Sequence, residues 1–165
     1  MGGAGGLVSV DPGRPVAAHA EQDLFSTAAI TTFRLNGQFL TIAEELAAPA
    51  GMTAAWWQVL GAVLRGPLSV AGIARAMGIT RQSVQRIADL LVDKGLAEYR
   101  PNPAHRRAKL VAVTESGREA IARIRPQHAV VAQRLADELG PDFAPTVAAL
   151  VRLSAALDAI GSPRE

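Results

Sequence analysis

Hydrophobic residues recur at spacings of three and four along most of the chain, which is the pattern of helices with one buried face. The pattern predicts helices over residues 23–47 and 54–65, with the breakers Pro49 and Gly51 between them and Thr53 as the N-cap of the second. The apolar face of the first helix holds Leu24, Ile30, Phe33, Leu40 and Leu46, and that of the second holds Trp57, Leu60 and Leu64. We therefore expect a mainly α protein.

The C-terminal third shows the same periodicity. A helix capped by Thr114 is expected over residues 115–139, and another, capped by Asp142, follows it. Pro126 is expected to kink or split the first of the two. Its apolar stripe consists of Ile121, Ile124, His128, Val131 and Leu135. Long amphipathic helices outside a small centre cannot bury their apolar faces alone, so we expect a second copy of the chain as partner.

The central segment VAGIARAMGITRQSVQRIAD, residues 70–89, has the spacing of a helix-turn-helix. Ser69 and Thr80 are placed to cap its two helices. Gly78 lies at the turn, where a positive φ is easy only for glycine, and the small Ala74 allows a close approach. The residues expected to pack the two helices together are Ile73, Met77, Ile79, Val84 and Ile87.

In a helix-turn-helix the second helix enters the major groove of DNA with its N-terminal residues at the base edges. The polar face predicted to make these contacts consists of Thr80, Arg81, Gln82, Ser83, Gln85 and Arg86. Arginine can bind guanine and glutamine can bind adenine, each through two hydrogen bonds. Ser69 is predicted to contact the DNA backbone. In isolation, the same polar residues would also suit an ordinary solvated helix.

Two short segments of strand-like composition, AEYR and KLVAVT, follow the helix-turn-helix, and the loop PNPAHRRA separates them. They predict a β-hairpin, and a hairpin in this position is a wing. Arginines at the tip of a wing can reach the minor groove or the adjacent phosphates. Arg106, Arg107 and Lys109 are the predicted DNA contacts of the wing. A solubilising hairpin tip is the simpler alternative.

Composition and charge support this interpretation. The 165 residues include 32 alanines, which favour helix. Nine Lys or Arg and three Asp or Glu lie between Arg65 and Lys109, a net charge of +6, whereas the rest of the chain carries −4. A basic segment in an otherwise acidic chain predicts a local surface for a polyanion.

The absence of cysteine excludes disulfides and thiolate metal sites, and it fits a cytoplasmic protein. Residues 1–20 are rich in glycine, proline and alanine, have no signal-peptide pattern, and are expected to form a flexible tail. Residues 46–64 carry no charge, but Pro49 and Gly51 interrupt them, so no membrane span is expected there.

Residues 53–117 together resemble the MarR family of bacterial transcription regulators. The matching features are the helix-turn-helix, the KGL before the first wing strand, the RRAKLVAVT strand entry and the T-x-x-G that begins the next helix. The resemblance implies a winged helix-turn-helix homodimer that binds a pseudo-palindromic operator in double-stranded DNA. It also implies release by a small phenolic or other aromatic effector, and action as a repressor more often than as an activator.

The wing departs from the family pattern. MarR proteins commonly have D-x-x-D-R-R there, in which an aspartate pairs with an arginine, whereas this chain has Asn102 and His105 at the acidic positions. Asparagine can hydrogen-bond but cannot form an ion pair. The rigidity of the wing and the role of Arg107 are therefore open at this point.

The resulting domain prediction has four parts: a tail over residues 1–20, an N-terminal dimerisation helix over 21–50, a DNA-binding domain over 53–113 and C-terminal dimerisation helices over 114–162. No catalytic motif occurs and the three histidines lie in different segments, so neither an enzyme nor a cofactor is expected. No cluster has metal-ligand spacing. The remaining rival is a winged helix that binds proteins without an operator, and the effector-binding residues are unknown.

Overall fold

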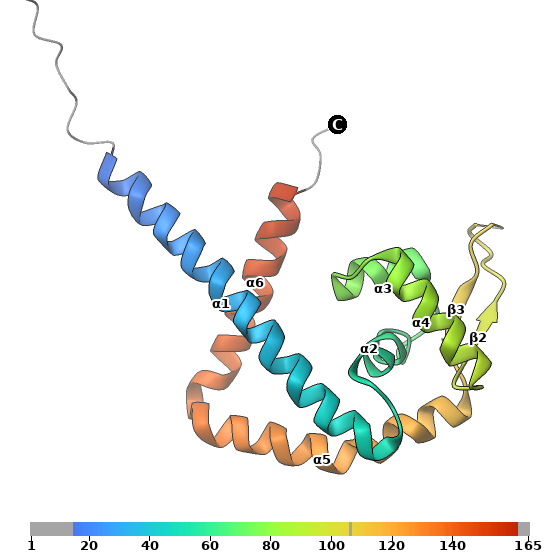
Figure 1. Ribbon diagram of the computed structural model, residues 1–165. Coiled ribbons are helices and arrows are strands. Elements are labelled where there is room, and N and C mark those ends of the chain that lie inside the picture. The colour runs from blue at the N-terminus through green and yellow to red at the C-terminus, as the bar shows by residue number, and fades with distance from the viewer. Residues whose placement is uncertain (1–14, 106, 162–165) are drawn as a thin grey trace, which may run out of the picture. The chain divides into compact units, whose positions relative to one another are not determined.

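The computed structural model describes residues 15–105 and 107–161, and within them the chain is mainly helical with one small sheet (Figure 1). It divides after Ile42 into two units, which we describe separately. The elements are α1 (Pro15–Ala47), η1 (Ala48–Ala50), α2 (Ala54–Ala62), β1 (Leu68–Ser69), α3 (Val70–Met77), α4 (Arg81–Asp93), β2 (Ala97–Arg100), β3 (Leu110–Val113), α5 (Glu115–Leu139), η2 (Gly140–Asp142) and α6 (Phe143–Gly161).

Helix α1 begins at Pro15, earlier than the predicted start at Asp23. Proline is well suited to the first position of a helix, and the alanines that follow are strong helix formers. Of the predicted flexible tail, residues 15–20 therefore belong to α1, and residues 1–14 lie outside the described residues.

Four of the predicted helix caps are confirmed. The hydroxyl oxygens of Thr53, Ser69, Thr80 and Thr114 each accept a hydrogen bond from the backbone N–H three residues further on, at 3.1–3.2 Å. At the other end of α3, Gly78 adopts a φ of +64°, as expected at the turn of a helix-turn-helix. These local hydrogen bonds set where α2, α3, α4 and α5 begin.

The core of the second unit lies where α2, α3, α4, α5 and the sheet meet. The predicted packing residues Ile73, Val84 and Ile87 are buried, and Met77 and Ile79 pack against them from partly buried positions. Leu60 from α2, Leu91 from α4 and Ile124 from α5 are also among the largest fully buried side chains. The helix-turn-helix is thus held on a common core with α2 and α5.

The sheet has three antiparallel strands in the order β1-β3-β2. The predicted hairpin is confirmed: Ala97 pairs with Val113 and Arg100 pairs with Leu110. The short strand β1 was not predicted; its Ser69 pairs with Leu110 on the other edge of β3. This pairing holds the start of α3 beside the wing.

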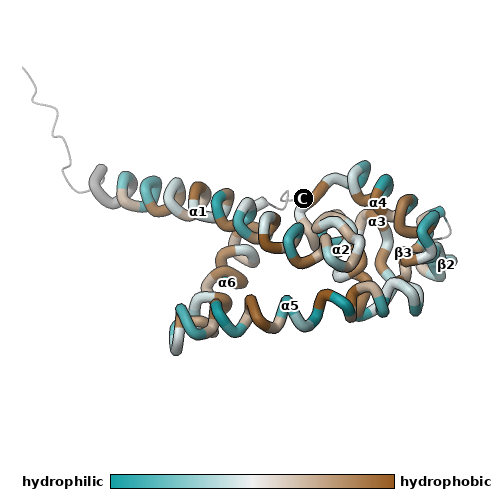
Figure 2. Tube along the Cα trace, turned by 60° about the horizontal axis from the view of Figure 1, so that its bottom comes forward, coloured by the Kyte–Doolittle hydropathy of each residue, from teal (hydrophilic) through white to brown (hydrophobic). Residues whose placement is uncertain are grey.

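A kink or a split was predicted at Pro126; helix α5 runs unbroken through this residue, so the split does not occur. Ile121 and Ile124 of its apolar stripe are buried, whereas Leu135 is exposed. Hydrophobic positions recur along α6 (Figure 2), and its large exposed side chains are Val147, Leu150, Val151, Leu157 and Ile160. In the single chain α6 thus leaves an apolar surface open.

Candidate nucleic-acid interface

A surface hollow of about 430 Å³ lies between the start of α3, the first turns of α4 and the wing. Its lining residues are Ser69, Val70, Ala71, Arg81, Gln82, Gln85, Ala108 and Lys109. Five of these are residues that we predicted to contact DNA, and they come from three separate segments of the chain. The fold therefore gathers a hydroxyl, two amides and two cations at one concave surface.

The first turn of α4 combines capping groups with free side chains. The Thr80 hydroxyl accepts from the Ser83 backbone N–H at 3.1 Å and donates to the Ser83 hydroxyl at 2.9 Å. Arg81, Gln82 and Arg86 are exposed on the same helix. Thr80 and Ser83 therefore stabilise the beginning of α4, and the longer side chains project from it.

Gln85 is held by two residues that the sequence analysis did not single out. Its side-chain nitrogen donates to the Asp89 carboxylate at 2.9 Å and to the Tyr99 hydroxyl at 2.8 Å. The Tyr99 hydroxyl in turn donates to the same Asp89 oxygen at 2.5 Å. Asp89 lies on α4 and Tyr99 on β2, so this triad connects the second helix of the helix-turn-helix to the wing.

The environment of Tyr99 keeps its hydroxyl protonated. Burial raises the pKa of Tyr99 to about 12, and the hydrogen bond and negative charge of Asp89 act in the same direction. The Lys109 ammonium lies 5.4 Å from the centre of the Tyr99 ring, a cation–π distance. Lys109 is thereby placed beside the triad, where the wing loop enters β3.

The wing loop is shaped by Asn102. Its side-chain oxygen accepts a hydrogen bond from the backbone N–H of Ala104 at 3.0 Å, and its carbonyl accepts one from His105 at 3.3 Å. Asparagine commonly stabilises turns in this way. The loop thus has a local turn at the position where the family that the sequence resembles commonly has an aspartate.

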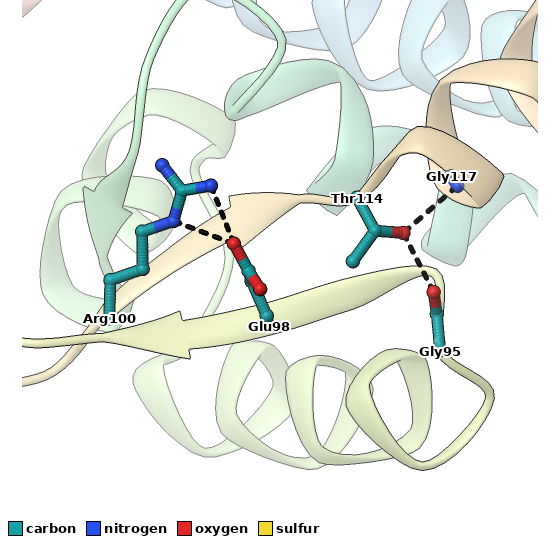
Figure 3. Close-up of polar contacts among 5 residues, drawn as sticks. All are labelled: Gly95, Glu98, Arg100, Thr114 and Gly117. Atoms are coloured by element: carbon teal, nitrogen blue, oxygen red, sulfur yellow. Dashed lines mark hydrogen bonds and ion pairs between the residues drawn. The ribbon is translucent and has the colours of Figure 1, made fainter.

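The basic residues of the wing differ in their surroundings. Arg107 is exposed at the tip, and Arg106 lies outside the described residues. Arg100 faces the Glu98 carboxylate, with its Nε 2.7 Å from Oε1 (Figure 3). Both side chains of this pair are about half exposed. The charge of Arg100 is therefore balanced locally, whereas Arg107 projects into solvent.

The base of the wing is joined to α5 through Thr114 (Figure 3). Its hydroxyl donates to the Gly95 carbonyl at 2.7 Å and accepts from the Gly117 N–H at 3.1 Å. A Cβ on Gly117 would lie 2.1 Å from the Leu96 carbonyl oxygen and 2.8 Å from a methyl of Val113. Only glycine fits this contact without a shift of the backbone.

The two tryptophans of α2 have different neighbours. The ring of Trp57 meets that of His128 on α5 edge-on, with 5.8 Å between their centres. Trp56 has the Lys94 ammonium 5.1 Å from the centre of its ring. Trp56 therefore lies beside the end of α4. Among residues 15–105 and 107–161, no group of three or more metal-ligating side chains occurs.

Comparison with known proteins gives three findings. A profile of the MarR family matches residues 50–108. An uncharacterized protein of Mycobacterium tuberculosis is 45% identical over 109 residues, which are 66% of this chain and 76% of that protein. The structure of the Mycobacterium tuberculosis transcriptional regulator MosR in complex with DNA is similar, with a TM-score of 0.67 and 22% identity over 81% of this chain and 97% of MosR.

A further similar structure is that of CouR from Rhodococcus jostii RHA1 bound to p-coumaroyl-CoA, with a TM-score of 0.61 and 26% identity over 84% of this chain and 95% of CouR. The profile match covers the helix-turn-helix and the start of the wing, and these segments supply every residue that lines the hollow except Lys109. The structural similarity also extends over the flanking helices. The chain belongs to the MarR family of transcription regulators.

Proposed function

We propose that this protein is a homodimeric, sequence-specific transcription regulator that reads a pseudo-palindromic operator. The observation that supports the proposal is the hollow in which Arg81, Gln82 and Lys109 meet the N-terminus of α3. A concave basic surface flanked by an exposed helix and a hairpin suits a duplex backbone passing between them. MosR, a structure of the same fold, is in complex with DNA.

Within this proposal the residues have different tasks. Arg81, Gln82 and Arg86 would reach base edges in the major groove, where arginine and glutamine carry specificity. Arg106, Arg107 and Lys109 would contact phosphates or the minor groove, and Ser69 would donate its hydroxyl to the backbone. Thr80 would act chiefly by capping the start of α4, and Ser83 by the two hydrogen bonds that it makes with the Thr80 hydroxyl.

Dimerisation is proposed from the apolar surfaces of the terminal helices, residues 21–50 and 114–162. Val151 and Ile160 of α6 are 64% and 76% exposed in the single chain. By length and composition alone, one 18-residue window within Glu115–Gly161 would also suit a membrane; its mean hydropathy is 1.5. Arg152 and Asp158 lie within α6, and charged residues are costly in a bilayer. We therefore favour a second copy of the chain as the cover of α6.

With two copies, two α4 helices would read half-sites about one helical turn apart. We further propose that the dimer acts as a repressor in the cytoplasm and that a small aromatic effector releases it from DNA. The effector proposal draws on CouR, whose structure holds p-coumaroyl-CoA.

Selection from a random pool of double-stranded DNA, followed by gel shift at moderate salt, tests the proposal. We expect a palindromic consensus with two equal half-sites, and a changed consensus for Arg81→Ala, Gln82→Ala or Arg86→Ala. A winged helix that binds only proteins would select no consensus. Absence of any sequence-selective shift would therefore overturn the regulator proposal in favour of that alternative.

A further inference from the structure

We propose that Asp89 and Tyr99 are positioning residues that make Gln85 read DNA through its carbonyl oxygen alone. The inference rests on the proposed function, and it assigns a specificity to one side chain of the same interface. In the absence of its neighbours, a glutamine at this position would be expected to bind adenine through both its oxygen and its nitrogen.

The orientation of the Gln85 amide follows from the chemistry of its neighbours. An ionised carboxylate only accepts hydrogen bonds, so the Asp89 oxygen at 2.9 Å requires the amide nitrogen rather than the amide oxygen. The Tyr99 hydroxyl uses its single hydrogen on Asp89 and therefore also accepts from the Gln85 nitrogen at 2.8 Å. Both neighbours thus select the same orientation of the amide.

This orientation decides what Gln85 offers to DNA. The amide nitrogen carries two hydrogens and already has two acceptors, one of them a carboxylate. N7 of a purine would have to compete with them. The carbonyl oxygen of Gln85 has neither neighbour, and Gln85 lines the hollow beside Arg81 and Lys109. An acceptor presented to the major groove selects an exocyclic amino group, N6 of adenine or N4 of cytosine.

Tyr99 ties this choice to the wing. Because Tyr99 lies on β2 and Gln85 on α4, the orientation of the amide depends on the wing remaining against the helix. Lys109 lies over the same ring, so the residue that holds Gln85 also carries a cation predicted to contact the DNA backbone. The Tyr99 side chain thereby contacts both a residue proposed to read a base, Gln85, and a residue predicted to contact the DNA backbone, Lys109.

The test uses the full-length protein and an operator selected from random DNA. The base pair read by Gln85 is the one whose preference is lost in Gln85→Ala. When the base at that pair is replaced by a base analogue that lacks the exocyclic amino group, the unmodified protein should bind the operator about tenfold more weakly. A 7-deaza purine, which lacks N7, should change its affinity by less than about twofold.

Two variants that each remove one negative charge from α4 separate the positioning of Gln85 from a general effect of charge on DNA binding. Asp89→Asn removes the acceptor-only neighbour and lets the Gln85 amide turn, so 7-deaza substitution should then weaken binding severalfold. Asp93→Asn, one turn further along α4, makes the same change of charge and should leave the 7-deaza effect below about twofold. Tyr99→Phe keeps the ring under Lys109 and the Asp89 acceptor but frees one hydrogen of the Gln85 amide nitrogen, so its 7-deaza effect should lie between those of the unmodified protein and of Asp89→Asn. Circular dichroism of each variant checks that the fold is kept.

Several outcomes would overturn the inference. The first is that the unmodified protein loses DNA affinity about tenfold when N7 is removed. The second is that the 7-deaza substitution has an equal effect on DNA binding by Asp89→Asn and by Asp93→Asn. The third is that the base preferences of Gln85→Ala are unchanged. If no consensus can be selected at all, the proposed function itself fails. That result is distinct from a consensus that is read without Gln85.

Discussion

The Thr114 hydroxyl donates to the Gly95 carbonyl at 2.7 Å and thereby ties the end of β3 to the turn that begins β2. The same hydroxyl caps α5 through the Gly117 N–H. The backbone N–H of Thr114 adds a bond to the Leu96 carbonyl at 3.2 Å. One residue therefore joins both strands of the wing to the long helix that leads away from it.

Replacing Gly117 by alanine should lower the free energy of unfolding by about 1–3 kcal/mol, because the new Cβ would overlap the Leu96 carbonyl. Gly61→Ala is the matched control. No atom lies within 4 Å of a Cβ at Gly61 in α2, so alanine should raise the free energy of unfolding by roughly 0.5–1 kcal/mol through helix propensity. Denaturant unfolding measures both; equal effects of the two variants would contradict the close contact at Gly117.

Tyr99 should titrate far above the ordinary value for tyrosine. It is the only tyrosine of the chain, so the ultraviolet absorbance of tyrosinate reports this group alone. We expect a midpoint near pH 12 in the folded protein, against about 10 after denaturation. Because folding raises this pKa, the contribution of Tyr99 to stability is complete below pH 10 and is lost as pH rises towards 12.

Burial is the largest cause of the raised pKa of Tyr99, and the hydrogen bond and charge of Asp89 come next. Asp89→Asn should therefore lower the midpoint of the Tyr99 titration, and more than Asp93→Asn does. Circular dichroism at each pH separates titration from unfolding. A folded protein with a midpoint near the value of the denatured chain would contradict the burial of Tyr99 against Asp89.

The exposed wing arginines should dominate the salt dependence of DNA binding. Arg106→Ala/Arg107→Ala should weaken binding to all DNA sequences and reduce the slope of log affinity against log salt by roughly 3–4, because the proposed dimer loses four arginines. The matched control is Glu98→Gln/Arg100→Gln, which removes a pair whose charges already balance, so the slope should stay nearly constant. Titrations at several salt concentrations measure the slopes; unchanged affinity and slope in the Arg106/Arg107 variant would contradict the assignment of the wing.

The exposed apolar face of α6 should be necessary for the dimer. Deleting residues 142–165 should yield monomers or insoluble protein. Val151→Arg, which places a charge at a side chain 64% exposed in the single chain, should yield a soluble monomer with unchanged helix content. Sedimentation measures the mass and circular dichroism the helix content. A dimer that survives both changes would show that α6 is not part of the interface.

Much of the helical framework could be read from neighbouring residues. Thr53, Ser69, Thr80 and Thr114 cap their helices as predicted because each bond joins a side chain to a backbone N–H only three residues away. The buried face of the helix-turn-helix was likewise predictable, since a periodicity of three and four residues reports the side of a helix that faces the core. The start of α1 was misplaced, because Pro15 suits the first position of a helix and the alanines after it have high helix propensity, but this segment has no apolar periodicity.

The candidate site shows where such prediction ends. The sequence named Gln85 as a polar residue on α4, but its partners are Asp89, one turn away, and Tyr99, which lies on another element. The spacing of Gln85 and Asp89 was a usable signal for a contact on one helix face. The contact with Tyr99 had no such signal, because it depends on how β2 packs against α4.

Sequence alone thus determined the helices, the hairpin and the basic character of the central segment, since these follow from local hydrogen bonds, periodicity and charge. Tertiary structure decided the pairing of β1 with β3, the need for glycine at position 117 and the orientation of the Gln85 amide. Each of these depends on atoms that are distant in the chain and meet only after the helices and the sheet have packed on their common core.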